Sequence, residues 1–331
     1  MDTALPVGPL SPYITPQLLK QYPTGISWNS IPPGGQRLGI NDEMRLAAQA
    51  NICETGTGLV DEVCKQPLRA TVDTLELYAP GRRASAPRGG RQSRPSTLIM
   101  TRWPVLSVVS VRVARNAFPR VWQTVPAGQY TPRYPVIGMY NSVAPASAGE
   151  GGQSITLAAG WFDWRFGEEG FVVEVAYING WPHTALTADA APAEDGQPQT
   201  IDVDDCTGWA ITAAAGGNMG ATGTVYDPAA QEVVHATAAT ADRGPGTLTL
   251  SAPLRSRHDA GTMVSTLPKS VVWATALFCV DVALERGATS TTVQEIPGKQ
   301  VAEDAGVKTK GGGSPSDWAE KILKGTFDRI I

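Results

Sequence analysis

The longest apolar stretch of the chain predicts a buried helix. Residues 271–284, VVWATALFCVDVAL, are almost continuously hydrophobic, yet the run is too short to cross a membrane and contains Asp281. Pro268 suits the first turn of a helix, and Gly287 suits its end, because glycine readily adopts the positive φ that terminates helices. We therefore expect a core helix that begins near Pro268, stops at Gly287 and spans no membrane.

Two further helices are predicted in the first 70 residues. In TPQLLKQY, Thr15 can cap a short helix and Pro16 fits its first position. A longer helix should begin at Asn41 or Asp42 and end at Pro67, with Gly56 and Gly58 weakening its middle enough for a kink or a break. Its expected apolar stripe is Met44, Ala48, Ile52, Leu59 and Val63.

The end of the sequence, SPSDWAEKILKGTFDRII, predicts an amphipathic helix behind the glycine-rich stretch KTKGGG. Ser314 can cap it, Pro315 can occupy the first position, and Asp317 can complete a capping box. Its apolar face is Ala319, Ile322, Leu323, Thr326, Phe327 and Ile330. Such a face can dock on a partner, or it can fold back onto the protein's own core, and the sequence leaves both open.

Much of the remaining chain alternates apolar and polar residues, which predicts strands. TVDTLELYA (71–79) and residues 97–115 show this pattern, and Val173, Val175 and Tyr177 share one face of a later strand. In residues 97–115 the partly alternating valines are Val105, Val109, Val111 and Val113. From residue 200 to 267 the chain reads as short strands and turns, with TLTLS and TMVSTL as the return hairpin of a small β-module.

The predicted fold class is therefore α+β. We expect a helical core with a β-hairpin or sheet region, an inserted small all-β module and a C-terminal amphipathic helix. The expected divisions are an extended N-terminal arm (1–40), a core (41–182 and 267–300), the inserted module (183–266), and a linker with the terminal helix (301–331). A chain of 331 residues accommodates two or three such domains.

Composition narrows the function further. The formal net charge of −4 argues against a dedicated nucleic-acid binder. The four cysteines show no CxxC or zinc spacing, and Cys53 and Cys64 lie three turns apart in one predicted helix, so reduced, buried cysteines are expected. The nine tryptophans fit a β-core or a subunit interface better than a sugar-binding platform.

No motif for catalysis, cofactor binding or metal binding was identified in the sequence. His258 stands beside Asp259, but adjacent strand residues point to opposite faces, so we expect a turn histidine that bonds backbone groups rather than a catalytic pair. His183 and His235 have no ligand partners at metal spacing. The acids of DVDDC (202–206) lack a calcium-loop spacing and are interpreted as a solvated strand edge. The protein is therefore expected not to be an enzyme.

One segment of the chain is strongly basic. Residues 80–95, PGRRASAPRGGRQSRP, contain five arginines and no acid, which is the composition of a mobile loop. The five are Arg82, Arg83, Arg88, Arg91 and Arg94. They form either a solvated loop or a contact with a partner ring or with DNA phosphates.

The order of these features resembles one protein family. The arm with ITPQLLKQYPTGISW, the helix end VCKQPLRAT, RWPVLSVVSVRV, VVEVAYINGWP, ALERGAT and a terminal amphipathic helix resemble the head-to-tail connector (adaptor) proteins of long-tailed bacteriophages. The chain is similar in particular to actinobacterial phage members with an inserted β-module. The resemblance covers nearly the whole chain and rests on structural rather than catalytic motifs. The inserted module and the long arginine loop depart from the minimal family pattern.

The resemblance implies a structural virion protein made in the host cytoplasm. It implies a homo-oligomeric ring, usually twelvefold, that docks beneath the portal protein, receives the next connector or tail-terminator protein, and lets double-stranded DNA pass without sequence preference. The portal-docking residues would be Trp318, Ile322, Leu323, Phe327, Ile330 and Ile331. Two other classes stay open: a virion-surface or carbohydrate-binding β-module protein, and a hydrolase whose site is assembled from distant residues.

Overall fold

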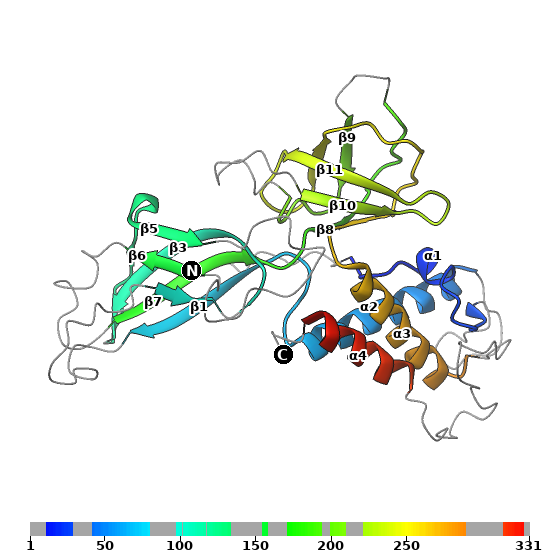
Figure 1. Ribbon diagram of the computed structural model, residues 1–331, viewed down its shortest axis with the longest axis horizontal. Helices are drawn as coiled ribbons and strands as arrows, with labels where there is room; N and C mark the ends of the chain where they lie inside the picture. The colour runs from blue at the N-terminus through cyan, green and yellow to red at the C-terminus, as the bar shows by residue number, and fades with distance from the viewer. Residues whose placement is uncertain are drawn as a thin grey trace. The chain divides into compact units, whose positions relative to one another are not determined.

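The computed structural model describes residues 11–28, 42–79, 97–100, 102–116, 118–133, 154–157, 171–193, 199–209, 221–288 and 314–327. Within them the fold is mixed α+β, with four α-helices and three antiparallel sheets (Figure 1). The chain divides into two compact units. The first unit comprises residues 1–68 and 182–331, and the second unit comprises residues 69–181.

The helices all belong to the first unit, and their termini follow the predicted signals. They are α1 (Pro16–Leu19), α2 (Asp42–Cys64), α3 (Lys269–Glu285) and α4 (Pro315–Phe327). The Thr15 side chain accepts a hydrogen bond from the backbone N–H of Leu18, and Gly287 at the end of α3 has a φ of 83°. Among the described residues no helix combines the length and apolar character needed to span a bilayer.

Helix α2 is continuous through Gly56 and Gly58, so the helix does not break there. Gly56 instead lets α3 approach closely: a Cβ atom there would lie 2.6 Å from Cys279 Sγ and 3.3 Å from the carbonyl oxygen of Thr275. The buried face of α2 consists of Gln49, Ile52, Cys53, Gly56, Thr57, Val60 and Cys64. The predicted stripe was therefore wrong at Met44, which is 47 % exposed.

Residues 183–265 form a six-stranded antiparallel sheet that curls round on itself, here called the curled sheet. Its strands are β8 (His183–Ala185), β9 (Gln199–Val203), β10 (Ala221–Tyr226), β11 (Glu232–Ala239), β12 (Gly246–Leu250) and β13 (Met263–Ser265). Their order is β8-β13-β10-β11-β12-β9, and a bridge between Leu186 and Val203 joins the chain just after β8 to β9. Alternate strand residues such as Leu248 and Leu250 fill the interior, together with Trp209 from the turn after β9.

The predicted return hairpin of β12 and β13 is wrong. Strand β12 pairs with β11 and β9, whereas β13 pairs with β10 and β8. The segment between them, residues 251–262, therefore crosses the sheet instead of turning back. This segment does contain turns, as its residues predicted, but the local sequence does not specify which strand the chain pairs with next.

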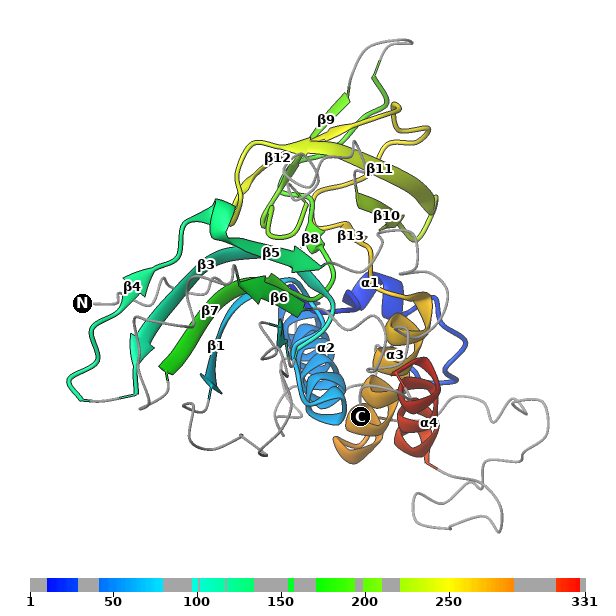
Figure 2. The ribbon, with the colours of Figure 1, turned by 60° about the vertical axis from the view of Figure 1, so that its left-hand side comes forward.

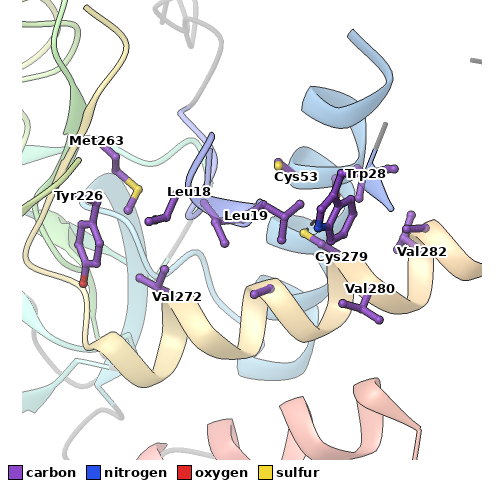
Figure 3. Close-up of a cluster of buried hydrophobic side chains, with 14 residues drawn as sticks. Leu18, Leu19, Trp28, Cys53, Tyr226, Met263, Val272, Cys279, Val280 and Val282 are labelled. Carbon is purple, nitrogen blue, oxygen red and sulfur yellow. Dashed lines mark hydrogen bonds between the residues drawn. The ribbon is translucent and has the colours of Figure 1, made fainter. Parts of the chain in front are cut away.

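A single apolar cluster connects the curled sheet to the helices within the first unit. Leu18 and Leu19 of α1 lie between Tyr226 and Met263 on one side and residues of α2 and α3 on the other (Figure 3). The four named side chains are at most 2 % exposed. Figure 2 shows α1 between the strands of the curled sheet and the helices. The N-terminal arm thus supplies part of the core of its own unit.

The second unit contains the other two sheets. One has the order β1-β7-β3-β4 and comprises β1 (Thr71–Ala79), β7 (Phe171–Asn179), β3 (Val105–Arg115) and β4 (Gln123–Thr124). The other has the order β2-β6-β5 and comprises β2 (Thr97–Ile99), β6 (Ser154–Leu157) and β5 (Tyr130–Arg133), the last preceded by a 3-10 turn, η3 (Ala127–Gln129).

The valine pattern of the second unit holds in β7 and breaks in β3. Val173, Val175 and Tyr177 are fully buried on one face, as predicted. In β3 the register to β7 shifts twice, between Val105 and Ser107 and between Val108 and Ser110. Each shift reverses which residues face inward, so Val109 is 42 % exposed while Val105 and Val111 remain buried.

The contact at Gly56 leads to a testable prediction. Replacing Gly56→Ala forces the new methyl group against Cys279 and should lower the free energy of unfolding by about 1–3 kcal/mol. The matched control is Gly58→Ala two residues away, where no atom lies within 4 Å of the new Cβ. That change should raise the free energy of unfolding by up to about 1 kcal/mol through helix propensity. Denaturant unfolding followed by helical circular dichroism would measure both, and equal effects would contradict close packing at Gly56.

Candidate functional site

The terminal helix α4 begins with the predicted capping box. The Ser314 hydroxyl accepts a hydrogen bond from the N–H of Asp317 at 3.2 Å, and the Asp317 carboxylate accepts one from the N–H of Ser314 at 2.8 Å. Helix α4 packs against α3, where the N–H of Ser316 donates to Asp281 Oδ2 at 2.8 Å. This contact gives the acid within the apolar run of α3 a structural role.

The apolar face of α4 is directed at the protein's own helices. Ala319 and Leu323 are fully buried and Phe327 is 4 % exposed. Two of the residues expected to dock on a portal, Leu323 and Phe327, are therefore covered by the fold itself. Ile322 is half-buried, and Ile330 and Ile331 lie outside the described residues.

The outer side of α4 presents a different set of groups. Trp318 is 46 % exposed, and the ammonium group of Lys321 lies 5.2 Å from its ring centroid, within the range of a cation–π contact. Lys324 pairs with Glu320 at 2.9 Å one turn further along. Of the expected docking residues that the structure describes, Trp318 is the one classed as exposed.

The five arginines expected to contact a partner ring or DNA lie outside the described residues. Arg82, Arg83, Arg88, Arg91 and Arg94 all fall within residues 80–96. Their role stays a prediction from the sequence.

His258 is buried between two carboxylates, an arrangement that the sequence did not predict. Its ring is fully buried, with Nδ1 2.7 Å from Asp227 Oδ2 and Nε2 2.5 Å from Glu232 Oε1. Asp227 and Glu232 flank the turn between β10 and β11, whereas His258 lies on the crossing segment 251–262. Asp259, the neighbour in sequence, is exposed and plays no part.

The hydrogen bonds of this cluster have a clear chemical requirement. An ionised carboxylate only accepts, so a proton on each ring nitrogen satisfies both contacts, as in the imidazolium form. Burial raises the pKa of Asp227, but the hydrogen bonds from His258 and from the N–H of Ala229 outweigh it and hold that pKa below 3.8. Glu232 also accepts the backbone N–H of Arg255 at 2.9 Å. The cluster therefore ties the crossing segment to the β10–β11 turn.

The acids of DVDDC are also structural, which corrects the expectation of a solvated strand edge for two of them. Asp204 accepts hydrogen bonds from Ser11 Oγ and Thr184 Oγ1, each at 2.6 Å. Asp205 accepts the N–H groups of Thr207 and Gly244. Asp202 alone is exposed.

The other two histidines take different roles. His183 is buried, with Nε2 3.0 Å from the carbonyl oxygen of Pro12 and Nδ1 2.9 Å from Ser265 Oγ. Because a carbonyl oxygen only accepts hydrogen bonds, Nε2 carries the hydrogen and donates a hydrogen bond to Pro12 of the arm. His235 sits at the surface of β11 beside Thr222 Oγ1 at 2.9 Å.

The cysteines are free and buried, as predicted. Burial raises the pKa of the Cys64 thiol to about 12, so it is protonated near neutral pH. Within the described ranges, no group of three or more histidine, cysteine or acidic side chains is placed to hold a metal ion. Trp28, Trp181 and Trp209 are buried, in line with tryptophans of a core.

Comparison with family models, curated proteins and solved structures gave no match to this chain.

The His258 cluster leads to a second prediction. Replacing Asp227→Asn removes one of the two charge partners of a buried ring and should lower the free energy of unfolding by about 3 kcal/mol at pH 7. His235→Gln, a change at the surface histidine, should alter it by less than about 0.5 kcal/mol. The fold lowers the pKa of Asp227 below its ordinary value of 3.8. The ionised carboxylate therefore contributes to the free energy of unfolding above that pH, and this contribution is lost as the pH falls through the lower pKa of the folded protein.

Denaturant unfolding of both variants across pH would measure this effect. The difference in free energy of unfolding between wild type and Asp227→Asn should become smaller as the pH falls below 3.8. A gap that is independent of pH would contradict an ionised Asp227 in the cluster.

Proposed function

We propose that this protein is a head-to-tail connector of a long-tailed bacteriophage. In this role it forms a homo-oligomeric ring, twelvefold by family resemblance, beneath the portal in the neck of the virion. The ring extends the DNA channel and receives the next connector or tail-terminator protein. The proposal rests first on the order of the segments along the chain. It is supported by the polar clusters among the described residues, such as His258 with its two carboxylates, because their contacts hold neighbouring segments together.

The inserted β-module belongs to the same proposal. We interpret the curled sheet as an insertion between β7 and α3, because its two ends meet. The N–H and the hydroxyl of Thr266 donate to the carbonyl oxygen of Pro182 at 2.9 and 3.1 Å. A chain without residues 183–265 would thus pass directly toward α3. Tyr226 and Met263 nevertheless lie in the helical core, so this insertion has become part of the unit that holds it.

The observation that carries the portal contact is the outward side of α4. The helix is capped independently, rests on α3 by one face, and presents Trp318 with Lys321 on the other. Tryptophan is among the residues most enriched at the energetic centres of protein interfaces. We assign the portal contact to this exposed side, together with the partly buried Ile322, and not to Leu323 or Phe327.

The negative net charge of the chain is compatible with a channel through which DNA passes. A ring through which DNA slides should bind it weakly, because phosphate contacts repeated around a ring would sum to a strong, salt-dependent hold. The formal net charge of −4 per subunit supports weak contact. A carbohydrate-binding role has less support, because three of the described tryptophans are inside the fold.

A pair of substitutions separates docking from folding. Trp318→Ala should leave the helical circular dichroism and the melting temperature nearly unchanged but reduce co-sedimentation with the portal ring by tenfold or more, on the order of 1.4 kcal/mol. Leu323→Asp places a charge in the core and should melt the helices. Undiminished portal binding by a folded Trp318→Ala protein would contradict the assignment of the outer side of α4.

The arginine segment is tested separately. Changing Arg82, Arg83, Arg88, Arg91 and Arg94 together to serine should weaken assembly onto a neighbouring protein ring, where guanidinium groups pair with carboxylates. Binding of duplex DNA by the isolated protein, weak at physiological salt, should hardly change. A steep salt dependence of DNA binding in the wild type that the five-serine variant lacks would instead identify a DNA contact.

A further inference from the structure

The end of β7 carries a buried amide that the fold leaves without a direct hydrogen bond. Asn179 is fully buried, and neither the oxygen nor the nitrogen of its side chain has a hydrogen-bond partner among the described residues. The same holds for the buried hydroxyl oxygen of Thr71 at the start of β1. Buried polar atoms of side chains in folded proteins nearly always have a partner, so this pair of residues calls for one that lies outside the protein chain.

Asn179 and Thr71 lie side by side on one face of their sheet. They are register partners in the β1–β7 ladder, and Val105 of β3 is the register partner of Asn179 on its other side. Directly opposed side chains in an antiparallel ladder point to the same face, with Cβ atoms about 4.5–5.5 Å apart. That face also carries the buried cluster that includes Val105 and Tyr177. The amide and the hydroxyl therefore lie together at one end of the apolar core of the second unit.

The neighbouring pair in the same ladder closes its polar end directly. Tyr177 is the register partner of Asp73, and its hydroxyl donates to Asp73 Oδ2 at 3.3 Å. Arg102 pairs with the same carboxylate at 3.0 Å. Asn179 and Thr71 make no such bond with each other through their side chains. A partner for them has to be small enough to fit between two adjacent strands.

The backbone around the two side chains is held by the protein itself. The N–H of Gly180 donates to the carbonyl oxygen of Pro104, and the N–H of Ala70 donates to the carbonyl oxygen of Trp181, each at 2.8 Å. These bonds fix the residues next to Asn179 and Thr71. The amide and the hydroxyl are therefore presented at a fixed spacing, as an ordered ligand requires.

The chemistry of the two groups defines what they can bind. The Asn179 amide offers two donors and one acceptor, and the Thr71 hydroxyl can both donate and accept. Both groups are neutral, so an ion buried between them would obtain no compensating charge from either. A water molecule donates as well as accepts, and a buried water typically makes about three hydrogen bonds to polar groups that lack protein partners.

We propose that Asn179 and Thr71 bind an ordered internal water molecule. The water bridges the amide on β7 to the hydroxyl on β1 and completes the hydrogen bonding at this end of the core. Thr71 and Asn179 each stand two residues from an end of the second unit, which comprises residues 69–181. The water thus joins the strand by which the chain enters this unit to the strand by which it leaves. The inference is independent of the connector role proposed above.

A high-resolution crystal structure of the full chain tests the site directly. We expect electron density for a water molecule within about 3.2 Å of both the Asn179 amide and the Thr71 hydroxyl. An ion at this position, a direct hydrogen bond between the two side chains, or the absence of density there would each overturn the proposal.

A second test distinguishes a hydroxyl that binds water from one that is simply unpaired. Valine has the shape of threonine without the hydroxyl, so Thr71→Val removes one partner of the water and should speed up amide hydrogen exchange in β1 and β7 by about three- to tenfold. Thr74→Val, at an exposed threonine of the same strand, is the matched control and should leave exchange unchanged. Slower or unchanged exchange in Thr71→Val would overturn the proposal, because removal of an unpaired buried hydroxyl relieves a desolvation cost.

A double-mutant cycle shows whether the two residues share one water. Asn179→Leu replaces the amide with an apolar side chain and should displace the water. In that background the Thr71 hydroxyl has lost its partner, so adding Thr71→Val should no longer speed up exchange in β1 and β7. Equal effects of Thr71→Val in the wild type and in the Asn179→Leu background would show that the residues act independently and would overturn the shared site.

Discussion

The first unit depends on the contact that the N-terminal arm makes between the helices and the curled sheet. Leu18 and Leu19 insert into a common apolar core, and burial of such side chains contributes about 1.5–3 kcal/mol each. The arm also supplies hydrogen-bond partners to polar groups in the interior. The Tyr13 hydroxyl donates to Asp61 and accepts the N–H of Leu68, and the carbonyl oxygen of Pro12 accepts from His183. Without the arm, the apolar core would lose Leu18 and Leu19, and Asp61 and His183 would each lose one hydrogen-bond partner.

Close helix packing follows from the same core. Gly56 brings α3 so near that Cys279 Sγ reaches the carbonyl oxygen of Ile52 at 3.6 Å. Helix α3 is consequently buried on most of its surface, and α4 covers part of what remains. This arrangement fixes which side of α4 faces outward. The outward side of α4, where we propose the portal contact, therefore depends on how closely α2 and α3 approach each other.

Polar clusters hold the crossing segments of the curled sheet in a comparable way. His258 joins two carboxylates of one turn, and Gln199 donates to the carbonyl oxygen of Ala191 while accepting the N–H of Leu254. Buried polar groups with complete hydrogen bonding specify a single arrangement, whereas apolar contacts tolerate several. Hydrogen bonds of this kind would suit the structural role proposed above, because assembly requires surfaces held in fixed positions.

The sequence by itself determined the features that depend on neighbours within one or two turns. The apolar run of α3, the caps at Thr15 and Ser314, the glycine at the end of α3 and the strand 71–79 were all predicted, because capping, propensity and alternation act locally. Tertiary structure alone decided that Gly56 is a point of close contact with α3, that Val109 turns outward at a bulge, and that Leu323 and Phe327 face their own core. It also decided that His258 meets Asp227 and Glu232, which are 31 and 26 residues away. The physical reason is that these contacts join residues distant in sequence. They depend on which strand or helix the chain packs against after each turn, and a local sequence pattern does not specify that choice.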